Sequence, residues 1–151
     1  NNIAAKAVAF AEALKPSFKI YAKQILKNAK VLEKELKNYG FKIMFGRTDN
    51  HMVLVDVFGS KGVTGEEAVV ALDAIGISLN KNMIPDDVRS PMDPSGIRIG
   101  VPAVTTRGMK EKEIKQIAGW ISEAIKNRNN KTILRKLHKE VIRFCKRFPL
   151  P

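Results

Sequence analysis

The stretch SGIRIGV, residues 95–101, decides the fold class because its apolar and polar side chains alternate. Ile97, Ile99 and Val101 fall on one side of an extended chain, and Arg98 and a glycine fall on the other. This period of two predicts a half-buried β-strand, with one face against a core and the other face open. Small neighbours flank Arg98, so a ligand could approach the backbone closely at this point.

On both sides of this strand the sequence predicts helices and further short strands. The predicted elements are helices over 2–14 and 16–39, strands over 41–45, 51–57 and 77–80, and two C-terminal helices. A further helix is predicted to begin at the capping-box pair Thr64 and Glu67 and to end at Gly76. The C-terminal helices have apolar positions at helical spacing, namely Ile114, Ile117, Ala118, Ile121 and Ile125 in one and Leu134, Leu137, Val141, Cys145 and Phe148 in the other. This order predicts an α+β domain, a small mainly antiparallel sheet with helices on one face.

The composition restricts the class of protein. The chain has 151 residues, 44% of them hydrophobic, which suffices for one domain with a core. Its single cysteine, Cys145, excludes a disulfide scaffold. No apolar run is long enough for a membrane helix, and the first residues lack a signal-peptide pattern. We therefore expect a soluble, cytoplasmic protein.

The net charge of +12 suggests nucleic acid as a partner, but its distribution argues otherwise. Residues 1–39 carry a net +5, residues 40–125 carry −1, and residues 126–151 carry +8. The surplus therefore lies on predicted terminal helices, where lysines usually form a solvated face. We expect no nucleic-acid partner and no membrane partner.

Several well-known site motifs are missing from the sequence. There is no GxGxxG, no P-loop and no GxSxG, and the two histidines lie in unrelated contexts. The best remaining candidate is the long predicted loop over 81–96 together with the strand that follows it, since long loops in compact domains are often functional.

Each candidate residue has both a functional and a structural interpretation. The planar fork of Arg98 matches a carboxylate bidentately, but the same arginine could form an ion pair at a sheet edge. Asn82 could contact a heterocycle or satisfy its own turn. His51 and Cys145 are better explained as structural residues, with Cys145 as a small core residue.

Taken together, several segments resemble the C-terminal part of serine hydroxymethyltransferase, a pyridoxal-phosphate enzyme of fold type I. The segments are the helical residues 1–36, TDNH at 48–51 with VLVD at 53–56, SKGVTGEEA at 60–68, GISLNKN at 76–82, SGIRIGVPAVTTRG at 95–108, and the ending RFCKRFPLP at 143–151. The resemblance implies transfer of the hydroxymethyl carbon of serine to tetrahydrofolate, which gives glycine and 5,10-methylenetetrahydrofolate.

The resemblance also implies roles for particular residues. Arg98 corresponds to the residue that binds the α-carboxylate of the amino acid, and Asn82 to a residue that contacts the pteridine of the folate. Ser90, Pro91 and Met92 correspond to a loop that contributes to the folate pocket. The sequence departs from the family here, because Met92-Asp93-Pro94 stands where the family usually has Ser-Pro-Phe or Pro-Pro-Phe followed by Val-Thr.

Other differences concern the cofactor and one turn. The His-Lys-Thr motif that supplies the family's pyridoxal-phosphate lysine has no match in this chain, so we expect no catalytic residue here and no activity from the chain alone. FGR at 45–47 stands where the family tends to have Ser-Gly-Gly.

We therefore expect the C-terminal piece of a longer enzyme, consistent with the missing initiator Met and a first helix that is apolar on every side. Residues 1–39 would be helices that lead out of an absent large domain, and residues 40–151 the small domain. The implied partners are serine or glycine, tetrahydrofolate, the large domain, and further copies in a homodimer or tetramer. The alternative is a freestanding basic α+β module that binds RNA or another polyanion.

Overall fold

The computed structural model describes residues 1–150 and contains an antiparallel sheet of four strands. The strands are β1 (Lys42–Ile43), β2 (Met52–Asp56), β3 (Asn80–Asn82) and β4 (Gly96–Gly100), in the spatial order β1-β2-β4-β3. In the central pair Leu54 lies opposite Arg98, and on the other side of β4 Asn80 lies opposite the same residue. The predicted α+β class with a small antiparallel sheet is confirmed.

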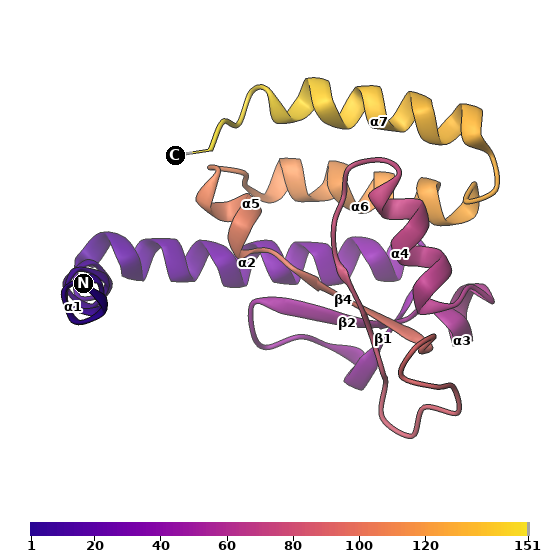
Figure 1. The fold of residues 1–151 in the computed structure, drawn as a ribbon, viewed down its shortest axis with the longest axis horizontal. Coiled ribbons are helices and arrows are strands. Elements are labelled where there is room, and N and C mark those ends of the chain that lie inside the picture. Colours follow the sequence, from indigo (N-terminus) through magenta and orange to yellow (C-terminus); the bar gives the residue numbers. More distant parts are fainter. Residues whose placement is uncertain (151) are drawn as a thin grey trace.

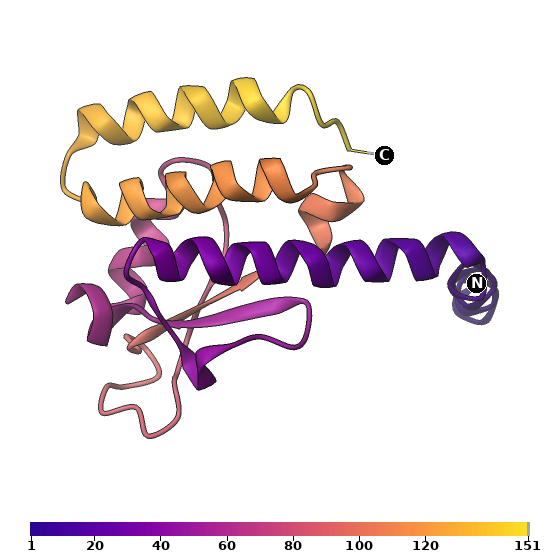
Figure 2. The same ribbon diagram turned by 180° about the vertical axis from the view of Figure 1, so that it is seen from behind.

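Helices cover one face of this sheet in two layers (Figures 1 and 2). The long α2 (Pro16–Asn38) packs on β1 and β2 and beside α6 (Glu111–Lys126), and α7 (Lys131–Cys145) lies over α6 as the outer layer. The shorter helices are α3 (Val57–Lys61), α4 (Gly65–Asp73) and α5 (Pro102–Thr106), and a 3-10 turn, η1 (Met44–Gly46), follows β1.

The core lies between the sheet and the helical layer. The strands contribute Val53, Val55, Ile97 and Ile99, all at most 6% exposed. The helices contribute Ala29, Leu32, Leu36, Leu72, Ile114, Ala118, Ile121, Ile125, Leu137 and Val141. Cys145 packs partly buried against this core. The C-terminal half of α2 is thus part of the core, and the division into 1–39 and 40–151 stays a proposal.

The first helix, α1 (Asn2–Ala13), has no buried residue and projects from the rest of the molecule near the start of α2 (Figures 1 and 2). Pro16 occupies the first turn of α2, so the chain changes direction there. Ile3, Phe10 and Leu14 are 86%, 67% and 86% exposed. Across residues 1–150, no helix combines the length and apolarity needed to cross a membrane.

Local signals predicted several boundaries correctly. Thr64 and Glu67 form the reciprocal capping box of α4. Gly40 and Gly76, the predicted helix ends, have φ angles of +76° and +83° in the left-handed region that glycine tolerates.

Two predicted strands were misplaced, and two short helices were missed. The strand predicted over 41–45 ends at Ile43, because Phe45 and Gly46 both turn to positive φ. The strand predicted over 77–80 lies instead at 80–82, which the prediction had placed at the start of the loop, because only these residues pair with β4. The missed helices are α3 and α5, each five residues long.

Candidate functional site

Arg98 lies on β4, in the middle of the sheet, on the face that the helices do not cover. Its side chain is exposed, and within residues 1–150 it has no hydrogen bond and no ion pair. By contrast, Arg89 bonds Asp93 and Arg107 bonds two carbonyl groups. Because β2 and β3 flank β4 on both sides, Arg98 does not lie at a sheet edge, where the structural alternative expected it.

A cleft of about 510 Å³ contains Arg98 and Asn82 together. Met52 and Leu54 of β2 provide apolar surface in this cleft, and the segment from Met44 to Asn50 forms another wall. The antiparallel register explains the grouping, because Asn82 pairs with Gly96, two residues before Arg98 on the same face. Tertiary pairing thus brings two predicted site residues to one place.

Asn82 is partly engaged by its own loop. Its side-chain Nδ2 donates a hydrogen bond of 2.6 Å to the carbonyl oxygen of Met83, as the structural interpretation expects. Its Oδ1 accepts no hydrogen bond from residues 1–150, so it can accept one from a ligand.

The segment after β3 is organised by Asp87. This carboxylate accepts hydrogen bonds from the amide and hydroxyl of Ser95, at 3.0 and 2.6 Å, and from the amides of Arg89 and Ile84. Desolvation raises the pKa of Asp87, but the hydrogen bonds from Ser95, Arg89 and Ile84 outweigh it and lower the pKa to about 2. Ser95 directly precedes β4, so this network holds the start of the strand that carries Arg98.

Ser90, Pro91 and Met92 are exposed and do not line the cleft. The Nζ of Lys81 donates a 2.6 Å hydrogen bond to the carbonyl oxygen of Met92. Because Lys81 and Asn82 point to opposite faces of β3, this bond holds the tip of the loop away from the cleft. The predicted role of these three residues in folate binding stays a prediction.

The wall of the cleft after β1 is attached to α2 through Glu33. This carboxylate accepts hydrogen bonds from Lys37 at 2.7 Å and from the amide of Thr48 at 2.9 Å. Burial raises the pKa of Glu33, but the bonds from Lys37, Thr48 and Lys30 hold it below its usual range. Lys37 also donates to the carbonyl oxygen of Gly46 at 2.5 Å.

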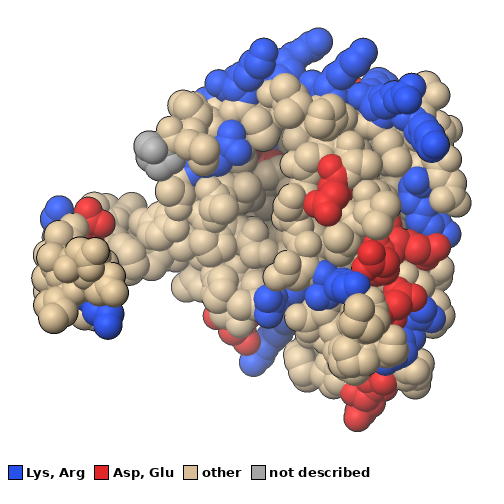
Figure 3. Space-filling model, viewed as in Figure 1, with Lys and Arg blue, Asp and Glu red and all other residues tan. Residues whose placement is uncertain are grey.

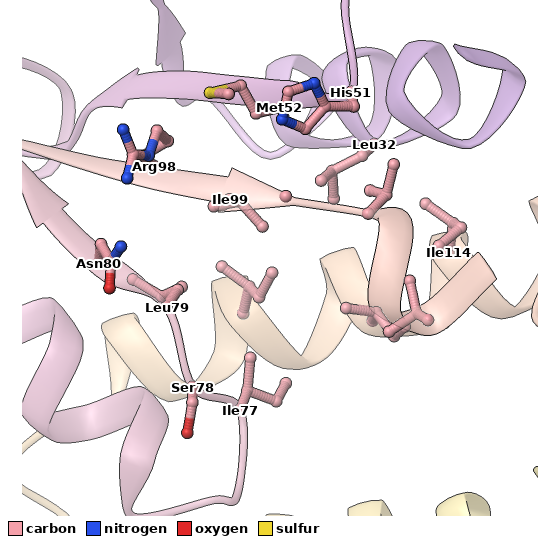
Figure 4. Close-up of a pocket in the computed structure, with 15 residues that line it drawn as sticks. Leu32, His51, Met52, Ile77, Ser78, Leu79, Asn80, Arg98, Ile99 and Ile114 are labelled. Atoms are coloured by element: carbon pink, nitrogen blue, oxygen red, sulfur yellow. The ribbon is translucent and has the colours of Figure 1, made fainter. Parts of the chain in front are cut away.

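A second hollow, of about 450 Å³, lies beside Arg98 at the other end of β4 (Figure 4). Asn80 lies on β3 beside Arg98, and Leu79, Ile99 and Ile114 give the hollow apolar walls. His51 is at the rim, and its backbone carbonyl accepts a hydrogen bond from Val101. Its structural role stays a prediction.

Sequence reasoning missed Met52, Leu54 and Phe45 as cleft residues. The period-two pattern of MVLVD at 52–56 could have placed Met52 and Leu54 on the face of Arg98. No comparable signal marks Phe45, because its position depends on a turn.

The cleft does not by itself fit pyridoxal phosphate. Among residues 1–150 its lining includes no lysine that could bond covalently to the cofactor's aldehyde. Nor does the described part of the chain contain a cluster of three His, Cys, Asp or Glu residues able to hold a metal ion. What the cleft offers is an exposed guanidinium, an amide oxygen and apolar surface.

Comparisons with known proteins identify close relatives of the chain. Residues 1–121 match the family model described as serine hydroxymethyltransferase. Proteins named serine hydroxymethyltransferase from Acidobacterium capsulatum and Koribacter versatilis are 54% and 51% identical to it over 148 residues. These matches cover 98% of this chain and 34% of each relative, so the chain spans about a third of their length.

Proposed function

The chain belongs to the serine hydroxymethyltransferase family, and from this premise we propose that it forms the C-terminal small domain of such an enzyme. The enzyme would interconvert serine and tetrahydrofolate with glycine and 5,10-methylenetetrahydrofolate. The observation that carries the proposal is the Arg98 guanidinium, which has no partner within residues 1–150 and is exposed in a cleft that also contains Asn82. The match to curated relatives over 98% of the chain supports it further.

Arg98 would bind the α-carboxylate of serine or glycine. A guanidinium stays charged at any working pH, and its parallel N–H groups form two hydrogen bonds with one carboxylate. Because β2 and β3 flank β4, the base of this side chain is held by a paired strand rather than by a loop. A carboxylate fixed in two places leaves the amino acid little rotational freedom, which orients the bonds at its Cα.

Asn82 would bind the pteridine ring of the folate, whose edge carries both donors and acceptors. Its Oδ1, which accepts no hydrogen bond within residues 1–150, is available for a donor of that ring. We propose that Ser90, Pro91 and Met92 contribute from outside the cleft, as part of a folate pocket completed by other residues. The flexible side chain of Met92, 76% exposed, could provide apolar contact there.

Pyridoxal phosphate, when bound, supplies an electron sink for the bonds that break at Cα. Because no lysine lines the cleft among residues 1–150, we propose that the covalent anchor comes from the large domain. The 151-residue chain alone would then bind carboxylates and folates weakly and would have no transferase activity.

The remaining features of the proposal concern organisation. Residues 1–39 would connect the large domain to a small domain of residues 40–151, and the exposed apolar surface of α1 fits a helix covered in a larger assembly. We propose a cytoplasmic homodimer or tetramer without nucleic-acid or membrane partners. Cell fractionation and analytical ultracentrifugation test the location and the oligomeric state.

One observation favours a second candidate, a module that binds RNA or another polyanion. Lysine and arginine side chains gather along the outer layer formed by α7, at the top of Figure 3. Its exposed basic residues include Lys131, Arg135, Lys136, Lys139 and Arg143. RNA binding with a steep dependence on salt would support this candidate, and binding without that dependence would reject it.

A chimera tests the main proposal. This chain replaces the matching third of the Acidobacterium capsulatum relative, and the unmodified relative serves as the control. We expect the chimera to bind pyridoxal phosphate and to form glycine from serine with tetrahydrofolate, and the isolated chain to do neither. A chimera with the circular dichroism and Tm of the relative but without turnover would contradict the proposal.

A further inference from the structure

Phe45 has a backbone conformation that large side chains avoid. Its φ and ψ are +57° and +11°, and the next residue, Gly46, has a φ of +66°. Two successive residues with positive φ are the pattern of a type I′ turn, whose first central position favours Asn, Asp or Gly. An aromatic residue there raises the free energy of the fold, because its Cβ crowds the backbone.

The side chain of Phe45 does not compensate for this cost by packing. Phe45 is 79% exposed, and within residues 1–150 its ring contacts no other aromatic ring and no cation. The turn itself is held in place, because Lys37 bonds the carbonyl oxygen of Gly46 and Arg47 pairs with Asp49 at 2.8 Å. These neighbouring contacts thus hold a strained residue in a position that is exposed to solvent.

The place where Phe45 is presented is the candidate site. It lines the cleft of about 510 Å³ that also contains Asn82 and Arg98, and Met52 and Leu54 add apolar surface to that cleft. An exposed ring at the wall of a cleft with an amide and a guanidinium suits a ligand that combines a planar aromatic system with polar edges. Strained residues concentrate at such binding positions.

We propose that Phe45 is a specificity-determining residue that packs its ring against the planar heterocycle of the folate. This inference rests on the proposed function, which supplies the folate, and adds a residue to its site. The strain at Phe45 is then the cost of presenting an aromatic surface. Replacing the ring should therefore stabilise the fold while weakening folate binding.

The experiment compares Phe45→Asn, which suits the turn and removes the ring, with Phe45→Tyr, which keeps the ring and the strain. We expect Phe45→Asn to raise the Tm of the chain by about 2–4 °C and Phe45→Tyr to leave it unchanged. In the chimera, Phe45→Asn should raise the KM for tetrahydrofolate roughly two- to tenfold, while the KM for serine stays within about twofold. Phe45→Tyr, which keeps the ring, should raise the KM for tetrahydrofolate much less than Phe45→Asn does.

Three results of this comparison would overturn the inference. The first is an unchanged KM for tetrahydrofolate in Phe45→Asn, and the second is an equal rise in both KM values, which would indicate a structural role or a contact with the large domain. The third is a Tm that does not rise, because the turn would then not be strained. If a chimera with the circular dichroism and Tm of the relative has no activity, the proposed function fails, and titration of the isolated chain with 5-formyltetrahydrofolate by NMR decides the inference separately. Weaker binding by Phe45→Asn than by the wild type supports it, and equal or absent binding rejects it.

Discussion

The carboxylate of Asp87 accepts hydrogen bonds from both the backbone amide and the hydroxyl group of Ser95, at 3.0 and 2.6 Å. Ser95 is 3% exposed, and its carbonyl oxygen in turn accepts hydrogen bonds from the amides of Val57 and Phe58 at the start of α3. One carboxylate in an otherwise irregular loop therefore connects that loop to the strand that carries Arg98. The loop is an ordered support of the candidate site.

Replacing Asp87 should destabilise the fold. Asp87→Ala leaves the buried amide and hydroxyl of Ser95 without their partner, which should lower the free energy of unfolding by about 1–3 kcal/mol. Asp86→Asn is the matched control, because Asn tolerates the positive φ of +57° at that position. Urea unfolding measures both variants. A loss of the same size in Asp86→Asn would contradict the role of the Ser95 network.

Asp87 should also make stability dependent on pH in acid. Its pKa is about 2 in the fold against an ordinary value of 3.8, so the unfolded chain binds the proton first as pH falls. The contribution of Asp87 is therefore complete above about pH 4 and is lost between about pH 4 and pH 2. Urea midpoints from pH 6 to pH 2 should fall less steeply in Asp87→Asn than in the wild type. Parallel curves would show that Asp87 does not titrate as described.

Gly96 should not tolerate a side chain. A Cβ at this position would lie 2.7 Å from both the carbonyl oxygen of Asn82 and the Cγ2 of Ile84, so the sheet would have to shift. We expect Gly96→Ala to cost about 1–3 kcal/mol. Gly100→Ala, on the same strand, should stay within about 0.5 kcal/mol, because its nearest contact would be an ordinary 3.7 Å to Pro102. Equal losses of stability in the two variants would indicate that Ala destabilises β4 at any position.

Arg98→Lys should weaken serine binding in the chimera without affecting the fold. A lysine keeps the charge but loses the paired N–H groups, so the KM for serine should rise roughly ten- to hundredfold. Because Arg98 is exposed and unpaired within residues 1–150, the Tm should change by no more than about 1 °C. Arg135→Lys, on the outer face of α7, is the control. A KM for serine equal to that of the wild type would reject the carboxylate role.

Asn82→Ala should affect the reaction that uses tetrahydrofolate and the reaction that does not to different degrees. Loss of the amide should reduce the tetrahydrofolate-dependent reaction more than folate-independent aldol cleavage, because only the former needs the pteridine. Asn80→Ala is the control, since Asn80 lies on the same face of β3 but outside the Asn82 cleft. Steady-state rates of both reactions measure the difference. Equal losses in both reactions would mean that Asn82 only shapes the loop through its bond to Met83.

The sequence alone predicted the features that neighbouring residues decide. Pro16 and Gly40 marked the ends of α2, Thr64 and Glu67 marked the start of α4, and alternation over 97–101 marked β4. These signals are local because a cap, a turn or a face alternation involves residues only a few positions apart. Arg98 could be predicted as a candidate site residue for the same reason, because its residue type and its small neighbours lie within one short stretch of sequence.

The tertiary structure decided what depends on pairing between distant segments. The shift of β3 to 80–82 follows from its register against β4, and the same register brings Asn82 into the cleft of Arg98. Lys81 donates a hydrogen bond to the carbonyl oxygen of Met92, which holds the tip of the loop on the opposite face of β3 from this cleft. The ring of Phe45 reaches that cleft only through a turn held by α2. Sequence thus determined which side chains are available, and long-range contacts determined which of them meet, because strand register and loop attachment are set by residues far apart in the chain.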